Sequence, residues 1–231
     1  MDIGDMTMID PTTLTNPTNP TNPMNYSSVI MPSTFPISQR PIYLHPTASV
    51  SNKEKETAYP QIAQAVSRVL IKHPDDRILV HTVSYELNTY LAKQLEGTGR
   101  ISTYHTPLAR QSAIDTYLSE PAKVLLAPSL DRGIDLPQDD CRAIIIPKVP
   151  YPSLGDKQIS ARLHSKGGQT WYAVQTIRKL VQMTGRGMRS ESDFCASYIL
   201  DKQFIVNVWK RSKHLIPKWW SDALVWNAQR L

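Results

Sequence analysis

The chain has 231 residues, of which 41% are hydrophobic, and this length can bury one large core or two small ones. Its net charge of +6 fits a polyanionic partner without establishing one, and its two cysteines, Cys141 and Cys195, have neither the spacing of metal ligands nor that of a disulfide framework. The sequence shows no signal peptide and no apolar run near the ~20 residues of a membrane span, so we expect a cytoplasmic, nucleoid or nuclear protein that is not secreted and has no membrane or metal partner.

Residues 1–32 are rich in asparagine, proline and threonine, and residues 16–23 repeat the tripeptide N-P-T. Proline fixes φ and lacks a backbone donor, so repeated prolines exclude both a helix and a central strand. We predict a disordered linker over 1–32 and a folded domain over 33–231.

From residue 40 onward, short apolar strands alternate with amphipathic helices. The predicted strands cover residues 40–44, 78–81, 101–104, 124–127, 143–146 and 196–200, and the predicted helices cover 60–73, 84–95, 108–118 and 171–184. This alternation predicts a parallel sheet with helices on both faces, and ligand sites of such sheets lie beyond the carboxyl ends of the strands. At that edge we place Ser84 with Tyr85, the segment 129–135, and Asp201.

Residues 182–189 read Q-x-x-G-R-x-x-R directly after the last predicted helix. Gly185 frees the backbone, and one helical turn would bring Arg186 and Arg189 to the same side. Two planar guanidinium groups aimed at one point suit the charge that develops on a transferring phosphoryl group. The alternative is a basic helix end whose arginines only favour the helix dipole.

Two further segments combine a strand end with polar residues. In the first, S-x-x-x-G-I-D-x-P, Gly133 lets the backbone approach a ligand closely and Asp135 can accept from a sugar hydroxyl or an arginine, unless the segment is an ordinary turn. In the second, Ser84 and Tyr85 follow a buried strand, and the alternative there is a helix N-cap with a packed tyrosine.

These three segments resemble motifs VI, V and IV of superfamily 2 helicases, in the form found in the XPD/DinG group. Other segments resemble the same group in the same order, from about residue 33 to about residue 220, among them 143–152, 189–204 and 215–219. Three departures stand out: Asp131-Arg132 in place of Trp-Glu, Cys195 in place of glycine, and Gln203 in place of arginine.

The resemblance implies a RecA-like C-terminal lobe of an ATP-dependent DNA helicase. It also implies three groups of site residues, namely Gln182, Arg186 and Arg189 for catalysis at the γ-phosphate, Gly133, Asp135 and Gly185 for nucleotide contact, and Ser84, Tyr85 and Ser129 for the backbone of a single strand. The single strand is expected to be DNA, because the group acts on DNA.

Parts of a complete helicase are missing from the sequence. It contains no G-x-x-x-x-G-K-[ST] loop, no acidic pair after a strand to hold magnesium, and no cluster of four cysteines for an iron–sulfur centre. We therefore expect ATP with Mg²⁺ to be held mainly by a partner, an N-terminal lobe with the Walker A and B motifs. The chain by itself is predicted to be inactive, and its arginines to act in trans.

Two other functions stay open from the residues. The chain can be a non-catalytic module that binds single-stranded nucleic acid or a partner helicase, or a structural α/β domain with a basic surface. The tryptophan-rich tail, 209–226, is interpreted as core packing rather than as a platform for bases, because aromatic side chains mostly serve burial.

Overall fold

The computed structural model describes residues 33–128, 134 and 136–226, and the predicted linker lies outside the described residues. The compact unit that carries every helix and strand discussed below begins at Phe35. We describe this unit by itself.

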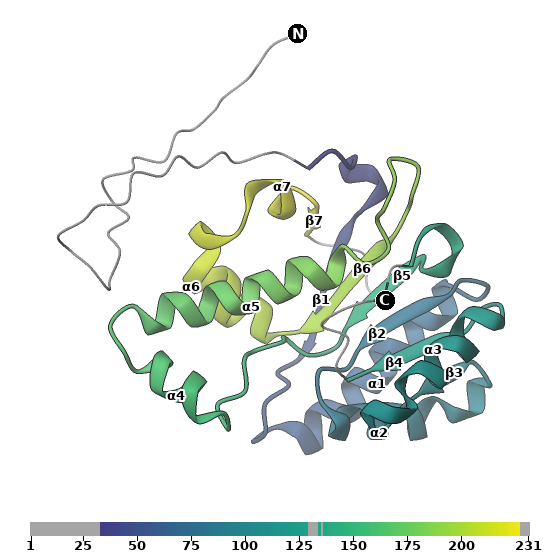
Figure 1. Cartoon of the computed structure of the whole chain (residues 1–231), viewed down its shortest axis with the longest axis horizontal. Helices are drawn as coiled ribbons and strands as arrows, with labels where there is room; N and C mark the ends of the chain where they lie inside the picture. Colours follow the sequence, from purple (N-terminus) through teal and green to yellow (C-terminus); the bar gives the residue numbers. More distant parts are fainter. Residues whose placement is uncertain (1–32, 129–133, 135, 227–231) are drawn as a thin grey trace, which may run out of the picture. The chain divides into compact units, whose positions relative to one another are not determined.

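Seven parallel strands of the described residues form one sheet, in the order β3-β4-β2-β5-β6-β1-β7 (Figure 1). The strands are β1 Ile42–Ala48, β2 Ile78–His81, β3 Ile101–Thr103, β4 Val124–Ala127, β5 Ala143–Ile146, β6 Ala196–Asp201 and β7 Leu224–Val225. The four central strands are buried along their whole length, because helices cover both faces of the sheet. The predicted parallel sheet is thus confirmed.

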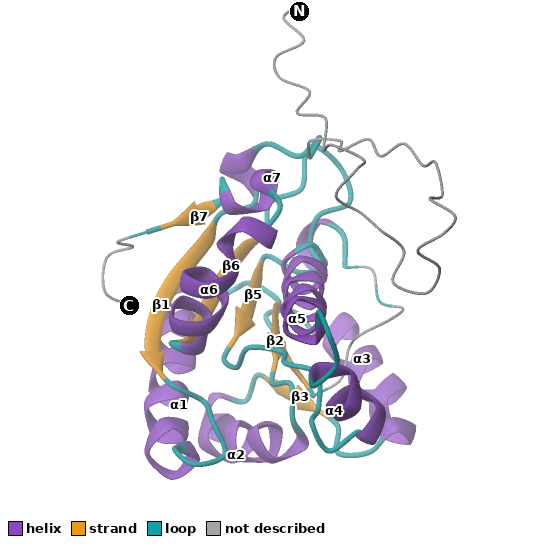
Figure 2. Cartoon of the chain, turned by 90° about the vertical axis from the view of Figure 1, so that its left-hand side faces the viewer, coloured by secondary structure: helices purple, strands orange, loops and turns teal. Residues whose placement is uncertain are grey.

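The helices divide between the two faces (Figure 2). They are α1 Lys55–Lys72, α2 Tyr85–Leu95, α3 Arg110–Ser119, α4 Lys157–Leu163, α5 Gly168–Thr184, α6 Lys210–Ser212 and α7 Lys218–Ser221, and a π-helical segment, Phe204–Trp209, precedes α6. The buried side chains of α1 and α2 form one core, and those of α3, α5 and the C-terminal helical segments form the other.

Helix α1 begins five residues before the predicted start, so Pro60 lies inside the helix and not at its first position. The missing N–H of a proline is tolerated near a helix start, where few N–H groups have partners. The added residues Ala58 and Tyr59 are buried, and the Tyr59 ring packs against Tyr90 of α2 with 5.3 Å between centroids. Burial of this turn explains why the helix extends beyond the proline.

The tail is largely core, as predicted. Trp220 is buried and donates from Nε1 to the hydroxyl of Thr184 on α5 at 2.8 Å. Trp209 and Trp219 pack against the same core, whereas Trp226 keeps 43% of its surface exposed.

Asp201 ties three segments together at the carboxyl edge of the sheet. Its Oδ1 accepts from the N–H groups of Val50 at 3.1 Å and Gln203 at 2.9 Å, and its Oδ2 accepts from Val149 at 2.9 Å. Burial raises the pKa of this carboxyl, and the three donors and the charge of Lys148 offset that effect only in part. Asp201 does lie at the predicted edge, but both of its oxygens serve the fold.

Replacing Asp201 tests this role. The Asp201→Asn variant must point an NH₂ group at a backbone donor, so we expect a loss of about 2 kcal/mol in the free energy of unfolding in urea. Asp115→Asn, at an exposed position on α3, is the control and should unfold at the wild-type urea concentration. Equal midpoints for Asp201→Asn and wild type would contradict the assignment.

Candidate functional site

The arginine segment lies beyond the end of α5, where the chain returns to the start of β6. Helix α5 ends at Thr184, and residues 185–187 continue as turns in which the N–H of Arg186 donates to Met183 O at 3.3 Å and that of Met188 to Gly185 O at 3.3 Å. The expectation that one helical turn aligns the two arginines is therefore wrong. Tertiary contacts set their positions instead.

The buried carboxylate of Asp193 holds these turns. Its Oδ2 accepts from the N–H groups of Arg189 at 2.6 Å and Ser190 at 2.7 Å, and its Oδ1 accepts from Gln138 at 3.3 Å. Burial raises the pKa of Asp193, but the N–H donors of Ser190 and Arg189 outweigh it and leave the pKa below its ordinary value. One ionised side chain therefore joins the arginine segment to the segment that follows β4.

Gly187 lets the arginine segment run directly over two cysteines. A Cβ at this position would lie 2.5 Å from the Sγ of Cys195 and 2.8 Å from the carbonyl oxygen of Cys141. Both cysteines are buried and free, and the N–H of Cys195 donates to Gln39 O at 2.9 Å. Cys195, which stands where the resembling group has glycine, thus fills space beneath Gly187.

Arg186 connects this segment to the one after β4. Its Nη1 donates to the carbonyl oxygen of Ile134 at 3.2 Å, and its side chain is half-buried. Ile134 and Leu136 are buried in the same core as α5, which fixes the acceptor. Gln182 and Arg189, by contrast, are exposed.

His81 is a buried residue of this site that sequence reasoning missed. It ends β2, is 1% exposed, and its two ring nitrogens have no hydrogen-bond partner among the described residues. Burial, with a further contribution from the charge of Arg186, lowers the pKa of His81 to about 3. His81 is therefore a neutral ring near the arginine, and its only signal in the sequence is a polar residue ending an apolar strand.

The predicted DNA contacts Ser84 and Tyr85 lie beyond the carboxyl end of β2, three and four residues after His81. Ser84 is the N-cap of α2, and its hydroxyl accepts from Leu87 N at 3.4 Å. The helix cap named above as the alternative to DNA contact is therefore formed by this serine. Tyr85 is 39% exposed. Val83 before them has a φ of +65°, which costs a β-branched residue about 1–3 kcal/mol.

The remaining predicted residues, Ser129, Gly133 and Asp135, lie outside the described residues. Gly185 caps the C-terminus of α5, and its N–H donates to Val181 O at 3.2 Å. The arginine segment thus lies between the end of α5 and the start of β6, whereas Ser84 and Tyr85 follow the end of β2.

Comparison with known proteins identifies the class. The helicase C-terminal domain family matches residues 66–223, and the chain belongs to this family. The recognition of an XPD/DinG-like superfamily 2 helicase lobe is confirmed.

The chain is similar in sequence to short stretches of two known proteins. The chain is 24% identical over 109 residues to the regulator of telomere elongation helicase 1 homolog of Caenorhabditis elegans, a match that covers 41% of this chain and 11% of the relative. It is 29% identical over 85 residues to the Fanconi anemia group J protein homolog of Gallus gallus, covering 32% of this chain and 7% of the relative. The matched region is thus a small part of either relative.

Two solved structures share the fold. Xpd4 of S. tokodaii aligns with a TM-score of 0.57 at 15% identity, over 80% of this chain and 37% of that one. Dbp5 of S. cerevisiae, bound to RNA and ADP BeF3, aligns with a TM-score of 0.54 at 11% identity, over 78% of this chain and 40% of that one. These likenesses confirm the RecA-like lobe.

The described residues include no group of three or more histidines, cysteines, aspartates or glutamates placed to hold a metal ion. Among the helices of the described part of the chain, none has the length and apolar character needed to cross a membrane.

The buried His81 predicts a pH dependence of stability. Because its folded pKa is about 3 and its ordinary value 6.5, the unfolded chain binds the extra proton, and stability present above pH 6.5 is lost as the pH falls toward 3. At pH 5 this loss is about 2 kcal/mol.

The measurement compares urea unfolding of wild type and His81→Phe at pH 7.5 and pH 5. Wild type should lose about 2 kcal/mol more than the variant between the two pH values. His164→Phe, at an exposed position, should behave as wild type does. If His81→Phe loses as much stability as wild type, His81 does not carry the effect.

Proposed function

We propose that the chain is the second motor lobe of an ATP-dependent DNA helicase and acts on a nucleotide that another lobe holds. The observation that carries the proposal is the double link between two segments. The side chain of Arg186 bonds to Ile134, and the carboxylate of Asp193 bonds to both Arg189 and Gln138. We expect a movement of the arginine segment to act on Ile134 and Gln138 through these bonds.

The arginine segment fits the phosphate end of ATP. Gln182 and Arg189 offer exposed donors, and Arg186 offers a charged fork whose neighbour His81 is neutral and does not compete for an anion. The segment does not fit the magnesium ion, since the oxygens of Asp193 accept from backbone donors. Mg²⁺ would therefore be held, with most of the nucleotide, by the N-terminal lobe with its Walker motifs.

The single-stranded DNA would cross the carboxyl edge of the sheet. In this proposal Ser84, Tyr85 and Ser129 contact the strand backbone, and Gly133, Asp135 and Gly185 link the nucleotide to those contacts. Closure of the two lobes around ATP would shift the strand. DNA is the proposed polymer, supported by the telomere helicase relative, and contacts to its phosphates would be tolerant of sequence.

A reconstitution experiment tests the role of Arg186. The chain is mixed with the isolated Walker-containing lobe of an XPD-type helicase and single-stranded DNA, and ATP hydrolysis is measured. We expect hydrolysis above that of either lobe alone, and a loss of at least about a thousandfold with Arg186→Ala, because an arginine that stabilises the transferring phosphoryl group is worth that much.

Arg178→Ala is the matched control, since Arg178 is exposed on α5, eight residues before Arg186. This variant should keep full activity, and Arg186→Lys should behave as Arg186→Ala does, because lysine lacks the planar fork. Undiminished hydrolysis with Arg186→Ala contradicts the motor role. Such a result, combined with weaker binding of DNA or of the first lobe, would instead favour the non-catalytic binding module.

A further inference from the structure

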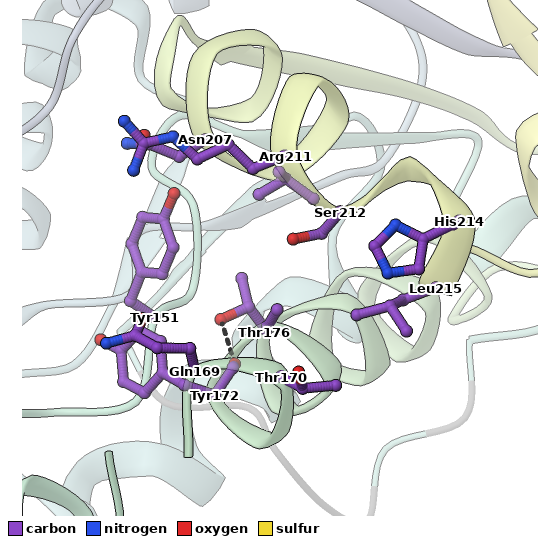
Figure 3. Close-up of a pocket in the computed structure, with 12 residues that line it drawn as sticks. Tyr151, Gln169, Thr170, Tyr172, Thr176, Asn207, Arg211, Ser212, His214 and Leu215 are labelled. Carbon is purple, nitrogen blue, oxygen red and sulfur yellow. Dashed lines mark hydrogen bonds between the residues drawn. The ribbon is translucent and has the colours of Figure 1, made fainter. Parts of the chain in front are cut away.

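A pocket of about 410 Å³ lies between the start of α5 and the C-terminal helical segments (Figure 3). Its volume falls in the range of small-ligand sites, about 300–1,000 Å³. The side chains used below are Tyr151, Gln169, Tyr172, Asn207, Arg211 and His214. None of them belongs to the three helicase motifs.

The pocket opens at the carboxyl edge of the sheet. Tyr151 follows the end of β5, and the first turn of α5, with Gln169 and Tyr172, forms one wall. Strand β5 pairs directly with β2, whose end leads to Ser84 and Tyr85. The pocket therefore lies at the same edge of the sheet as Ser84 and Tyr85, the residues proposed to contact single-stranded DNA.

Two aromatic rings form the apolar side of the pocket. The rings of Tyr151 and Tyr172 are parallel within 7° and have centroids 6.0 Å apart. The hydroxyl of Tyr172 donates to Pro152 O at 2.8 Å, which fixes that ring. Burial, and next the charge of Asp201, raise the pKa of Tyr151 to about 12, so its ring stays neutral. Such fixed flat surfaces suit the stacking of a nucleobase.

The opposite wall is polar and basic. The side chains of Asn207 and Arg211 lie above the Tyr151 hydroxyl, with His214 further along the same wall (Figure 3). Arg211 and His214 are exposed, and Arg211 makes no ion pair with a described residue. The described lining includes no aspartate or glutamate. This wall therefore attracts an anion.

Gln203 fits the same arrangement. It stands where the resembling group has arginine, and its side-chain oxygen accepts from the Nδ2 of Asn207. The bond holds the Asn207 amide at the rim of the pocket without placing a second arginine there. Amide groups in such a position can bond to the edge of a base.

We propose that this pocket receives one nucleotide of the single strand, with its base against Tyr172 and its phosphate at Arg211. An aromatic face, an amide rim and a cation, in a described lining without aspartate or glutamate, are the features that recognise a nucleotide unit. The inference rests on the proposed function, because it requires that single-stranded DNA cross the carboxyl edge of the sheet.

The test measures binding of the full chain to a labelled oligothymidine of twelve nucleotides by fluorescence anisotropy. Tyr172→Leu should weaken binding at least about fivefold, since stacking on an aromatic side chain is worth about 1–3 kcal/mol per base. Tyr172→Phe should stay close to wild type, because it keeps the ring. Urea unfolding of each variant confirms that the domain remains folded.

Arg211→Ala should weaken binding and reduce the salt dependence, lowering the slope of log K against log salt by about 0.7, the value for one contact to a single-strand phosphate. Arg68→Ala is the matched control, because Arg68 is exposed on α1, which covers the other face of the sheet. That variant should leave the slope unchanged.

The outcomes separate this inference from the proposed function. If wild type binds the oligonucleotide and both Tyr172→Leu and Arg211→Ala bind it as tightly, the pocket does not bind single-stranded DNA. The lobe then binds DNA at another place. If wild type does not bind at all, the strand role itself fails. Competition by thymidine monophosphate at micromolar concentration would mark a site for a free nucleotide and would also overturn the inference.

Discussion

The interaction on which the site depends is the bonding of one buried carboxylate to three backbone donors. Asp193 accepts from the backbone N–H groups of Arg189, Ser190 and Gln138. Helix α5 ends at Thr184, so these bonds, and not helical ones, hold the segment that follows. Hydrogen bonds to an ionised acceptor are stronger than neutral ones, at about 1.5–3 kcal/mol each. A turn that would otherwise be free to move is thereby fixed against the chain after β4. The carboxylate acts on the arginines through the backbone, and not by pairing with their side chains.

A parallel sheet has two distinct edges, one at the amino ends and one at the carboxyl ends of its strands. The arginine segment lies at the amino edge, whereas Ser84, Tyr85 and the pocket beside Tyr172 lie at the carboxyl edge. Ile134, a buried residue of the segment between β4 and β5, accepts the bond from Arg186. In the proposed function this segment is the mechanical link between the nucleotide and the strand. Asp201 likewise joins separate segments at the carboxyl edge, because its carboxylate accepts from their backbone N–H groups.

Much of the fold could be predicted from local pattern, and the positions of the site residues could not. Strands β2, β4 and β5 have the predicted bounds, because a strand buried on both faces reads as an unbroken apolar run. The start of α1 was missed because Pro60 suggested a first position, while distant packing of Tyr59 extends the helix. The motif spacing singled out the arginines, but their geometry comes from Asp193 and Gln138, which lie 55 residues apart. No periodicity signals such a bond or the buried His81.

The central claim is that this chain acts on a nucleotide held by another lobe, and ATP hydrolysis by the purified chain tests it most directly. Hydrolysis would be measured with and without single-stranded DNA, in the presence of Mg²⁺. The account predicts a rate no higher than background in both cases, because the arginine segment offers donors for phosphate but no carboxylate for the metal ion. Robust hydrolysis, lost with an Arg186→Ala variant that rules out a contaminant, would mean that the chain holds a complete nucleotide site and would contradict the account.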